Sequence, residues 1–301
     1  MVPGLPIGAS PDDDFHLATI WCDRGDAAIC RRTDEPAMDG VERVRVLPVL
    51  GPGLACFAFR AEQSAGCQAS LHRQPGLVDG RADAGLYPGG FHRTMSLFVT
   101  ARIGRSVLAM RMASWLLAIS LLLAACVLAA PDLRRAVTLG ALTTLVPLGV
   151  FLFASTNPSG LTVAGVIAYW SAALAHTGGS RQDRRRTWAL VALLLAGALV
   201  ALGSRYDAGI YLGVASAAAW LAGGGFLPER RRRSSLVLVL GAVGSVFALL
   251  GTQNQRALGG LPETDRPLTV VLFENALELP RLVLGSLGTL VSAGSTRRCP
   301  P

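Results

Sequence analysis

Three consecutive carboxylates and an imidazole lie near the start of the chain. Asp12, Asp13 and Asp14 are followed by Phe15 and then by His16. Adjacent carboxylates beside an imidazole can bind a hard divalent cation. They can also supply a general base, because repulsion between like charges raises one carboxyl pKa towards neutrality. The alternative interpretation is a solvated acidic turn, in which an Asp caps a helix that begins near Phe15.

Two further polar groups are candidates for substrate binding. Asn157 and Gly160 belong to a short polar turn between two apolar stretches, although turn chemistry alone also explains these residue types. Glu274 and Glu278 are four residues apart, so they would share one helix face, and a solvated face is the alternative there. The sequence contains no Walker loop, Rossmann fingerprint, nucleophile elbow or HExxH motif, so ATP, nicotinamide and catalytic zinc have no positive support.

The elements that must position these residues are membrane helices. The chain is 51% hydrophobic and 16% charged, whereas soluble domains average about 25% charged residues. From Ala113 onwards, apolar stretches alternate with arginine clusters, and an uncharged run of about 20 residues can cross a bilayer as a helix. We therefore expect an all-α integral membrane bundle of six or seven transmembrane helices. The six predicted spans are 107–130, 136–155, 160–178, 187–204, 208–227 and 234–252.

The arginine clusters at 131–135, 180–186 and 228–233 predict the orientation of the bundle. Short basic loops stay on the cytoplasmic side of a membrane. The spans hold almost no ionisable residues, and His176 lies near an end, which counts against ion-coupled transport. Nucleic-acid binding is excluded as well, because no basic face with interleaved aromatic residues is present. Frequent glycine and alanine within the spans favour close helix packing.

This orientation divides the chain into four predicted parts. An exterior, loop-rich head covers residues 1–105, and the six-helix membrane region covers 106–252. An exterior loop follows at 253–280, and an incomplete seventh span with an aberrant tail occupies 281–301. The start of the chain lacks the charged and apolar regions of a signal peptide, so we expect a further helix upstream. The ragged end likewise predicts truncation.

Four cysteines lie in the predicted head. Cys22 and Cys30 are eight residues apart, and Cys56 and Cys67 are eleven apart. An exterior location is oxidising, so local disulfides Cys22–Cys30 and Cys56–Cys67 are the expected pairing among three possible connectivities. A zinc site is the alternative, but the close CxxC pairs that structural zinc prefers are missing.

Several segments together resemble a known family. They are PDDDFH (11–16), CFAFRAEQSAGC (56–67), LYPGGFHRTMS (86–96), the stretch 146–174 and LPRLVLGSLGT (279–289). The family is the bacterial polytopic membrane proteins grouped as "domain of unknown function 2142", common in actinobacteria. Its acidic element after the first helix is matched by Pro11, Asp12, Asp13 and His16, with Asp13 in place of Glu. Its polar turn is matched by Ser155, Asn157, Pro158 and Gly160.

The resemblance implies a layout similar to GT-C glycosyltransferases in the bacterial plasma membrane. In that class the donor is a polyprenyl-phosphate sugar, and the acceptor here would be an envelope glycan or lipid. Asp12 or Asp13 would act as the base or hold a divalent cation together with Asp14, and His16 would support them. Convergence of Asn157, Gly160 and Glu274 on the same cavity would favour this enzyme. The alternative is a non-catalytic membrane component, such as an envelope assembly partner or a transporter subunit for lipid or polysaccharide.

Overall fold

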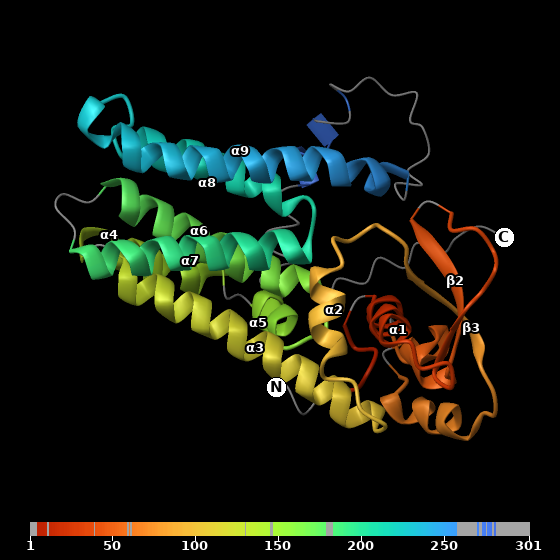
Figure 1. Ribbon diagram of the computed structural model, residues 1–301. Helices are drawn as coiled ribbons and strands as arrows, with labels where there is room; N and C mark the ends of the chain where they lie inside the picture. Colours follow the sequence, from red (N-terminus) through yellow and green to blue (C-terminus); the bar gives the residue numbers. More distant parts are fainter. Residues whose placement is uncertain are drawn as a thin grey trace.

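The computed structural model describes most of the chain up to residue 257. It describes residues 5–257 apart from 11, 39, 59, 61, 130, 145–146 and 179–182, together with 270, 273–274, 276–278 and 280. The predicted seventh span and tail at 281–301, and most of the predicted loop at 253–280, lie outside the described residues. Figure 1 shows two regions, a head and a set of long helices beside it.

The head contains a small sheet that the sequence interpretation did not anticipate. The strands β1 (Cys30–Arg32), β2 (Val41–Val46) and β3 (Val78–Asp83) form an antiparallel sheet in the order β1-β2-β3. Helix α1 (Asp13–Arg24) packs against this sheet and also against α2 (Gly90–Ser96), which stands between the head and the long helices. Three 3-10 helices connect β2 to β3, namely η2 (Pro48–Leu50), η3 (Pro52–Ala55) and η4 (Ala65–Arg73).

Burial of one side of the sheet and of α1 explains why the head folds. Leu17, Ile20 and Trp21 of α1 are fully buried, as is Val46 on the inner face of β2. Removing such side chains from water is the main favourable contribution to folding. The connection from α1 to β3 is also polar, because the hydroxyl of Thr19 accepts the backbone N–H of Asp83 at 2.9 Å.

Two disulfides close loops in the head, as the sequence predicts. Cys22 is bonded to Cys30 with the Cα atoms 5.1 Å apart, and Cys56 is bonded to Cys67 with the Cα atoms 6.3 Å apart. The first joins the C-terminal turn of α1 to β1, and the second joins η3 to η4. All four thiols are therefore in disulfides, which removes the alternative of a zinc site built from them.

The long helices follow in sequence order beside the head. They are α3 (Ile103–Leu128), α4 (Pro131–Thr144), α5 (Pro147–Phe153), α6 (Pro158–Gly178), α7 (Arg184–Ser204), α8 (Ala208–Ala222) and α9 (Pro228–Ala257). Among the described residues, α3, α6, α7 and the segment 234–251 of α9 are long and apolar enough to cross a membrane. The fifth predicted span corresponds to α8, which is apolar but shorter at 15 residues. The second predicted span overlaps α4 and α5.

Small residues bring the helices close together. A Cβ atom added to Gly165 of α6 would lie 2.7 Å from the carbonyl oxygen of Gly197 of α7, and the converse substitution meets Gly165 at the same distance. Between α8 and α9, a Cβ on Gly209 would collide with the carbonyl oxygen of Gly244. These backbones therefore touch, as the density of glycine and alanine in the spans predicts.

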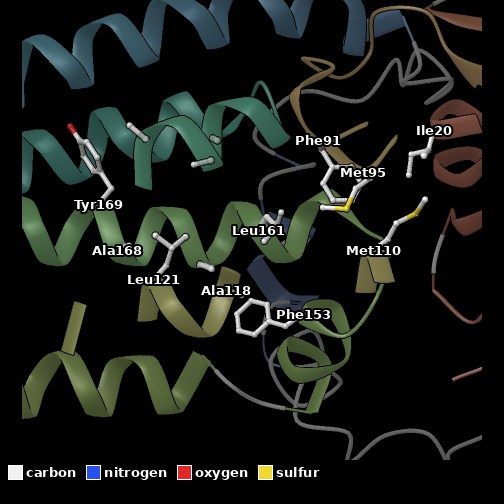
Figure 2. Close-up of a cluster of buried hydrophobic side chains, with 14 of the residues drawn as sticks. Ile20, Phe91, Met95, Met110, Ala118, Leu121, Phe153, Leu161, Ala168 and Tyr169 are labelled. Atoms are coloured by element: carbon white, nitrogen blue, oxygen red, sulfur yellow. The ribbon is translucent and has the colours of Figure 1, made fainter. Parts of the chain in front are cut away.

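The head and the helices share one hydrophobic cluster. Figure 2 shows Phe91 and Met95 of α2 between Ile20 of α1 and Leu161 of α6. The backbones also meet here, since a Cβ on Gly90 of α2 would lie 2.6 Å from the carbonyl oxygen of Gly203 in α7. The head is therefore packed onto the bundle rather than tethered by a linker.

Candidate functional site

Asp13 is the buried member of the three consecutive carboxylates. It is the first residue of α1 and only 1% exposed. Its Oδ2 atom accepts the backbone N–H of Gly8 at 3.0 Å and that of Ser10 at 3.4 Å, and it lies 3.2 Å from Nη2 of Arg111. Its Oδ1 atom has no hydrogen-bond partner within the described part of the chain. One carboxylate oxygen is thus held by three donors, and the other is buried without a partner.

The cation that holds Asp13 comes from the first long helix. Arg111 of α3 is 2% exposed and donates to the carbonyl oxygens of Leu5 at 2.6 Å and Pro6 at 3.1 Å, besides the carboxylate of Asp13. Arg111 therefore connects residues 5–6 and the first residue of α1 to α3. The expectation that the spans hold almost no ionisable residues was wrong here, because Arg111 lies inside the predicted span 107–130. A charge within an apolar stretch is itself a sign of a specific partner.

Burial sets the acidity of Asp13. Loss of hydration raises the pKa of Asp13 from 3.8 to about 6, and the charge of Arg111 with the N–H groups of Ser10 and Gly8 opposes this rise. A carboxyl group with such a pKa is largely ionised at pH 7, yet it is a stronger base than an exposed aspartate.

A pocket of about 530 Å³ opens at the start of α1. The three consecutive residues Asp12, Asp13 and Asp14 contribute to its wall, and the aromatic side chains of Phe57 and Phe151 also line it. Phe57 belongs to the loop between Cys56 and Cys67, whereas Phe151 belongs to α5. The pocket therefore lies where the head meets the bundle, and it combines acidic and apolar surface.

The three carboxylates do not form a ligand set that fits a divalent cation. Asp13 is paired with Arg111, and Oδ2 of Asp14 lies 3.6 Å from Nη2 of Arg81. Asp12 is exposed and precedes the helix in a left-handed backbone conformation, with φ of 59°. Within the described residues, no group of three or more His, Cys, Asp or Glu side chains is arranged to hold a metal ion.

His16 has a different partner from the one that the sequence predicts. Its Nδ1 atom shares a hydrogen bond of 3.1 Å with Nε2 of His92 in α2, and both rings are buried. Oδ2 of Asp83 lies 4.0 Å from Nδ1 of His92. Burial lowers the pKa of His92 from 6.5 to about 4. Burial, followed by the charges of His92 and Arg205, lowers the pKa of His16 well below its usual value.

The histidine pair therefore connects α1 to α2 as two neutral rings. Aromatic rings surround it, with Tyr87 at 5.0 Å and Phe91 at 6.3 Å from the ring of His16 between centroids. The sequence interpretation did not pair His92 with His16. Only the packing of α1 against α2 brings the two rings together.

Arg205 extends this cluster towards the polar turn. Its guanidinium lies 5.9 Å from the ring centroid of Tyr87, pairs with Asp207 at 2.9 Å and donates to Oγ of Ser159 at 3.2 Å. The turn that contains Ser159 is thus linked to the head through Arg205, although it does not line the pocket of Asp13.

The predicted substrate-binding residues have local structural roles. Oδ1 of Asn157 accepts the backbone N–H of Ser159 at 2.8 Å, which caps the start of α6. A Cβ on Gly160 would lie 2.7 Å from the carbonyl oxygen of Leu152, so glycine permits close approach of α5 and α6. Glu274 is exposed. Among the described residues that line the Asp13 pocket, Asn157, Gly160 and Glu274 do not occur.

Comparison with known proteins places the chain in a family. The model of the family described as "Predicted membrane protein (DUF2142)" matches residues 4–290, which is nearly the whole chain. No curated protein and no solved structure gives a significant match. The match includes both the head and the helices, in agreement with their shared hydrophobic cluster. The chain therefore belongs to this family of predicted membrane proteins.

Proposed function

We propose that this protein is a GT-C-like glycosyltransferase of the bacterial cell envelope. It would transfer a sugar from a polyprenyl-phosphate donor to the hydroxyl of an envelope glycan, with Asp13 as the general base. The observation that carries this proposal is the unpartnered Oδ1 atom of Asp13, a buried carboxylate in the wall of a pocket between the head and the bundle.

The environment of Asp13 suits the role of a base. Its Oδ2 atom is held by Arg111 and two backbone N–H groups, so the carboxylate has a fixed orientation while Oδ1 can accept the proton of a hydroxyl group. A pKa of about 6 keeps the carboxylate ionised at neutral pH and close to the optimum for proton transfer. The attacking hydroxyl oxygen would form the new bond to the sugar as its proton passes to Oδ1, and the lipid phosphate would leave.

The position of the pocket supports a donor that is dissolved in the membrane. Phe151 of α5 provides an apolar wall from the bundle, and the acidic start of α1 provides a polar wall from the head. A lipid-linked sugar approaching along the helices and a glycan approaching from the head side would meet at such a boundary. The catalytic roles predicted for Asp12 and His16 stay predictions.

The test is Asp13→Asn in the full-length protein, expressed in a strain that lacks its own copy. Asn keeps the shape of the side chain and can accept from Arg111, but it cannot take up a proton. We expect the envelope glycans of this strain to match those of the deletion strain. Asp34→Asn, at an exposed aspartate of the head outside the strands, is the matched control and leaves the glycans unchanged.

Two further measurements make the test decisive. The yield and thermal midpoint of the Asp13→Asn protein report on folding, so a loss of glycan with normal folding supports catalysis. Normal glycans in the Asp13→Asn strain, beside altered glycans in the deletion strain, would refute the assignment of Asp13 as the base.

The second candidate is a non-catalytic membrane component. The observation that favours it is the pairing of Asp13 with Arg111, because this pair by itself explains a buried aspartate as an anchor between head and bundle. On this hypothesis, the Asp13→Asn protein loses thermal stability, and the glycans change only as far as the amount of folded protein falls.

A further inference from the structure

The sheet of the head presents arginine side chains on one face. Residues alternate along the strands, so that Val44 and Val46 are buried while Arg43 and Arg45 between and beside them are exposed. Arg31 of β1 and Arg81 of β3 are exposed as well. In Figure 1, α1 lies between the sheet and α2, so the outer side of the sheet looks away from the long helices. We call the outer surface formed by Arg31, Arg43, Arg45 and Arg81 the arginine face.

The strand register places these arginines in opposed pairs. Arg31 is directly opposite Arg45, and Arg43 is directly opposite Arg81. Like charges at directly opposite positions of an antiparallel pair are destabilising. A ligand that supplies negative charge between the strands would relieve this repulsion, so the face has an electrostatic reason to bind an anion.

Two acidic neighbours of the arginine face are held only weakly. Glu35 lies 3.3 Å from Arg43 and Asp79 lies 3.0 Å from Arg45, and these carboxylates are 59% and 90% exposed. Ion pairs that are exposed to this degree contribute little, so a ligand can replace them at small cost. Arg45 also donates to the carbonyl oxygen of Leu77 at 2.7 Å, which orients its guanidinium. Among the described residues, Arg31 takes part in no ion pair with a carboxylate.

Arg81 links the arginine face to the pocket of Asp13. Nη2 of Arg81 lies 3.6 Å from Oδ2 of Asp14, and Asp14 lines that pocket. We propose that the arginine face binds an acidic glycan, which is the acceptor whose hydroxyl enters the pocket. This inference rests on the proposed function, because it names the chemical class of the acceptor for the same site.

Several features favour a glycan over other polyanions. The face looks away from the apolar helices, so it does not lie where those helices would meet lipid. The exposed strand positions on this face carry arginine and Asp79 and no aromatic side chain, whereas proteins that bind single-stranded nucleic acids stack bases on aromatic rings. Guanidinium groups pair with carboxylate and phosphate groups through two parallel hydrogen bonds. Repeated acidic groups along a polysaccharide match several arginines at once.

The test is a binding measurement on the full-length protein in detergent micelles. The probes are a fluorescent uronic acid polymer, a polyol-phosphate polymer and neutral dextran, each followed by fluorescence anisotropy. The variant is the double substitution Arg43→Gln and Arg81→Gln, which removes both arginines of one opposed pair. The control is Arg60→Gln with Arg73→Gln, which removes two positive charges from exposed arginines of the head outside the sheet.

We expect the wild-type chain to bind an acidic polymer and not dextran, more weakly at high salt because exposed charges are screened. The sheet variant should bind roughly tenfold more weakly through loss of charge-assisted contacts, while the control variant stays close to wild type. A larger effect with the uronic acid polymer identifies carboxylates as the ligand groups, and a larger effect with the other polymer identifies phosphates.

Other outcomes overturn the inference. Equal losses in the sheet and control variants would mean unspecific attraction by net charge. Tighter binding of an oligonucleotide or of anionic lipid vesicles than of either polymer would reassign the surface. Because Asp13→Asn removes the proposed base but not the arginine face, it should bind the polymer normally. Inactive Asp13→Asn protein together with unaffected binding by the sheet variant would therefore leave the proposed function standing and refute this surface.

Discussion

The head and the helix bundle bury polar groups in opposite ways. The interior of the head contains ionisable side chains, including Asp13, His16 and His92, and Arg111 reaches it from α3. The bundle is packed through glycine and alanine, and it contains buried contacts between neutral groups, such as the hydroxyls of Tyr169 and Ser216 at 2.6 Å, with His176 as a buried ionisable residue of α6. The stability of the head should therefore respond to pH and charge, and that of the bundle to side-chain volume.

The largest expected effect comes from removing Arg111. Arg111→Met leaves the carboxylate of Asp13 buried without its cation, and breaking a buried pair in this way costs about 3–5 kcal/mol. The measurement is amide hydrogen exchange of α1 at pH 8. The loss of free energy for opening α1 should be smaller at pH 5, because Asp13 takes up a proton below its pKa of about 6 and no longer needs a cation.

Arg105→Met is the control for this prediction, because Arg105 is an exposed arginine on the same helix. It should change the free energy of opening by less than about 0.5 kcal/mol. Adding Asp13→Asn to Arg111→Met should restore part of the loss. An equal loss at pH 8 and pH 5 would show that packing, and not charge, sets the role of Arg111.

The next effect is the acid sensitivity of the head. The pKa of His92 is about 4 in the folded chain, below its ordinary value of 6.5. The stability that the neutral ring contributes is present above pH 6.5 and is lost as the pH falls towards 4. At about 1.4 kcal/mol per pH unit, the total is on the order of 3 kcal/mol.

Asp13 acts with the opposite sign, because its pKa is raised and protonation on acidification favours the folded state between pH 6 and 3.8. Because His92→Gln removes the titrating ring, the hydrogen-exchange protection of α1 and α2 should fall less between pH 7 and pH 4 in this variant than in the wild type. His72→Gln, at an exposed histidine, should behave as wild type. An unchanged pH slope in His92→Gln would assign the acid sensitivity to other groups.

The smallest effect concerns close packing in the bundle. Gly209→Ala would place a methyl group against the carbonyl of Gly244, so α8 and α9 must separate, at a cost of about 1–3 kcal/mol. Gly104→Ala in α3 meets nothing within 4 Å, so the better helix propensity of alanine should leave stability unchanged or raise it by up to about 1 kcal/mol. Thermal midpoints in detergent at pH 5 and pH 8 measure both. A strong pH dependence of the Gly209→Ala loss would contradict the contrast between the two regions.

Parts of this architecture follow from the sequence because they depend on local pattern. Uncharged apolar runs predict helices that can cross a membrane, and four helices of the described residues meet that criterion. Cysteines eight and eleven residues apart predict the two disulfides, because short loops bring such thiols together. The three strands were not predicted, because the head was interpreted as loop-rich, although the alternation of valine and arginine in β2 is the pattern of a half-buried strand.

Only part of the candidate site could be predicted, because local pattern reveals neighbours along the chain and not distant pairs. The acidic residues were evident from their spacing, but repulsion among three carboxylates was the wrong explanation for a raised pKa. Burial is the main cause for Asp13, and Arg111 opposes it. Arg111 is 98 residues further along the chain than Asp13, and His92 is 76 residues further than His16. Local pattern carries no information about pairs at such separations.

The sequence by itself determined that the chain belongs in a membrane, that its helices approach closely and that its head is crosslinked, because these properties depend on composition and short spacing. Only the tertiary structure decided which aspartate is buried, which cation holds it and which oxygen stays free. Those outcomes depend on how α1, α2 and α3 pack, since burial and long-range charge pairs exist only once distant segments are brought together.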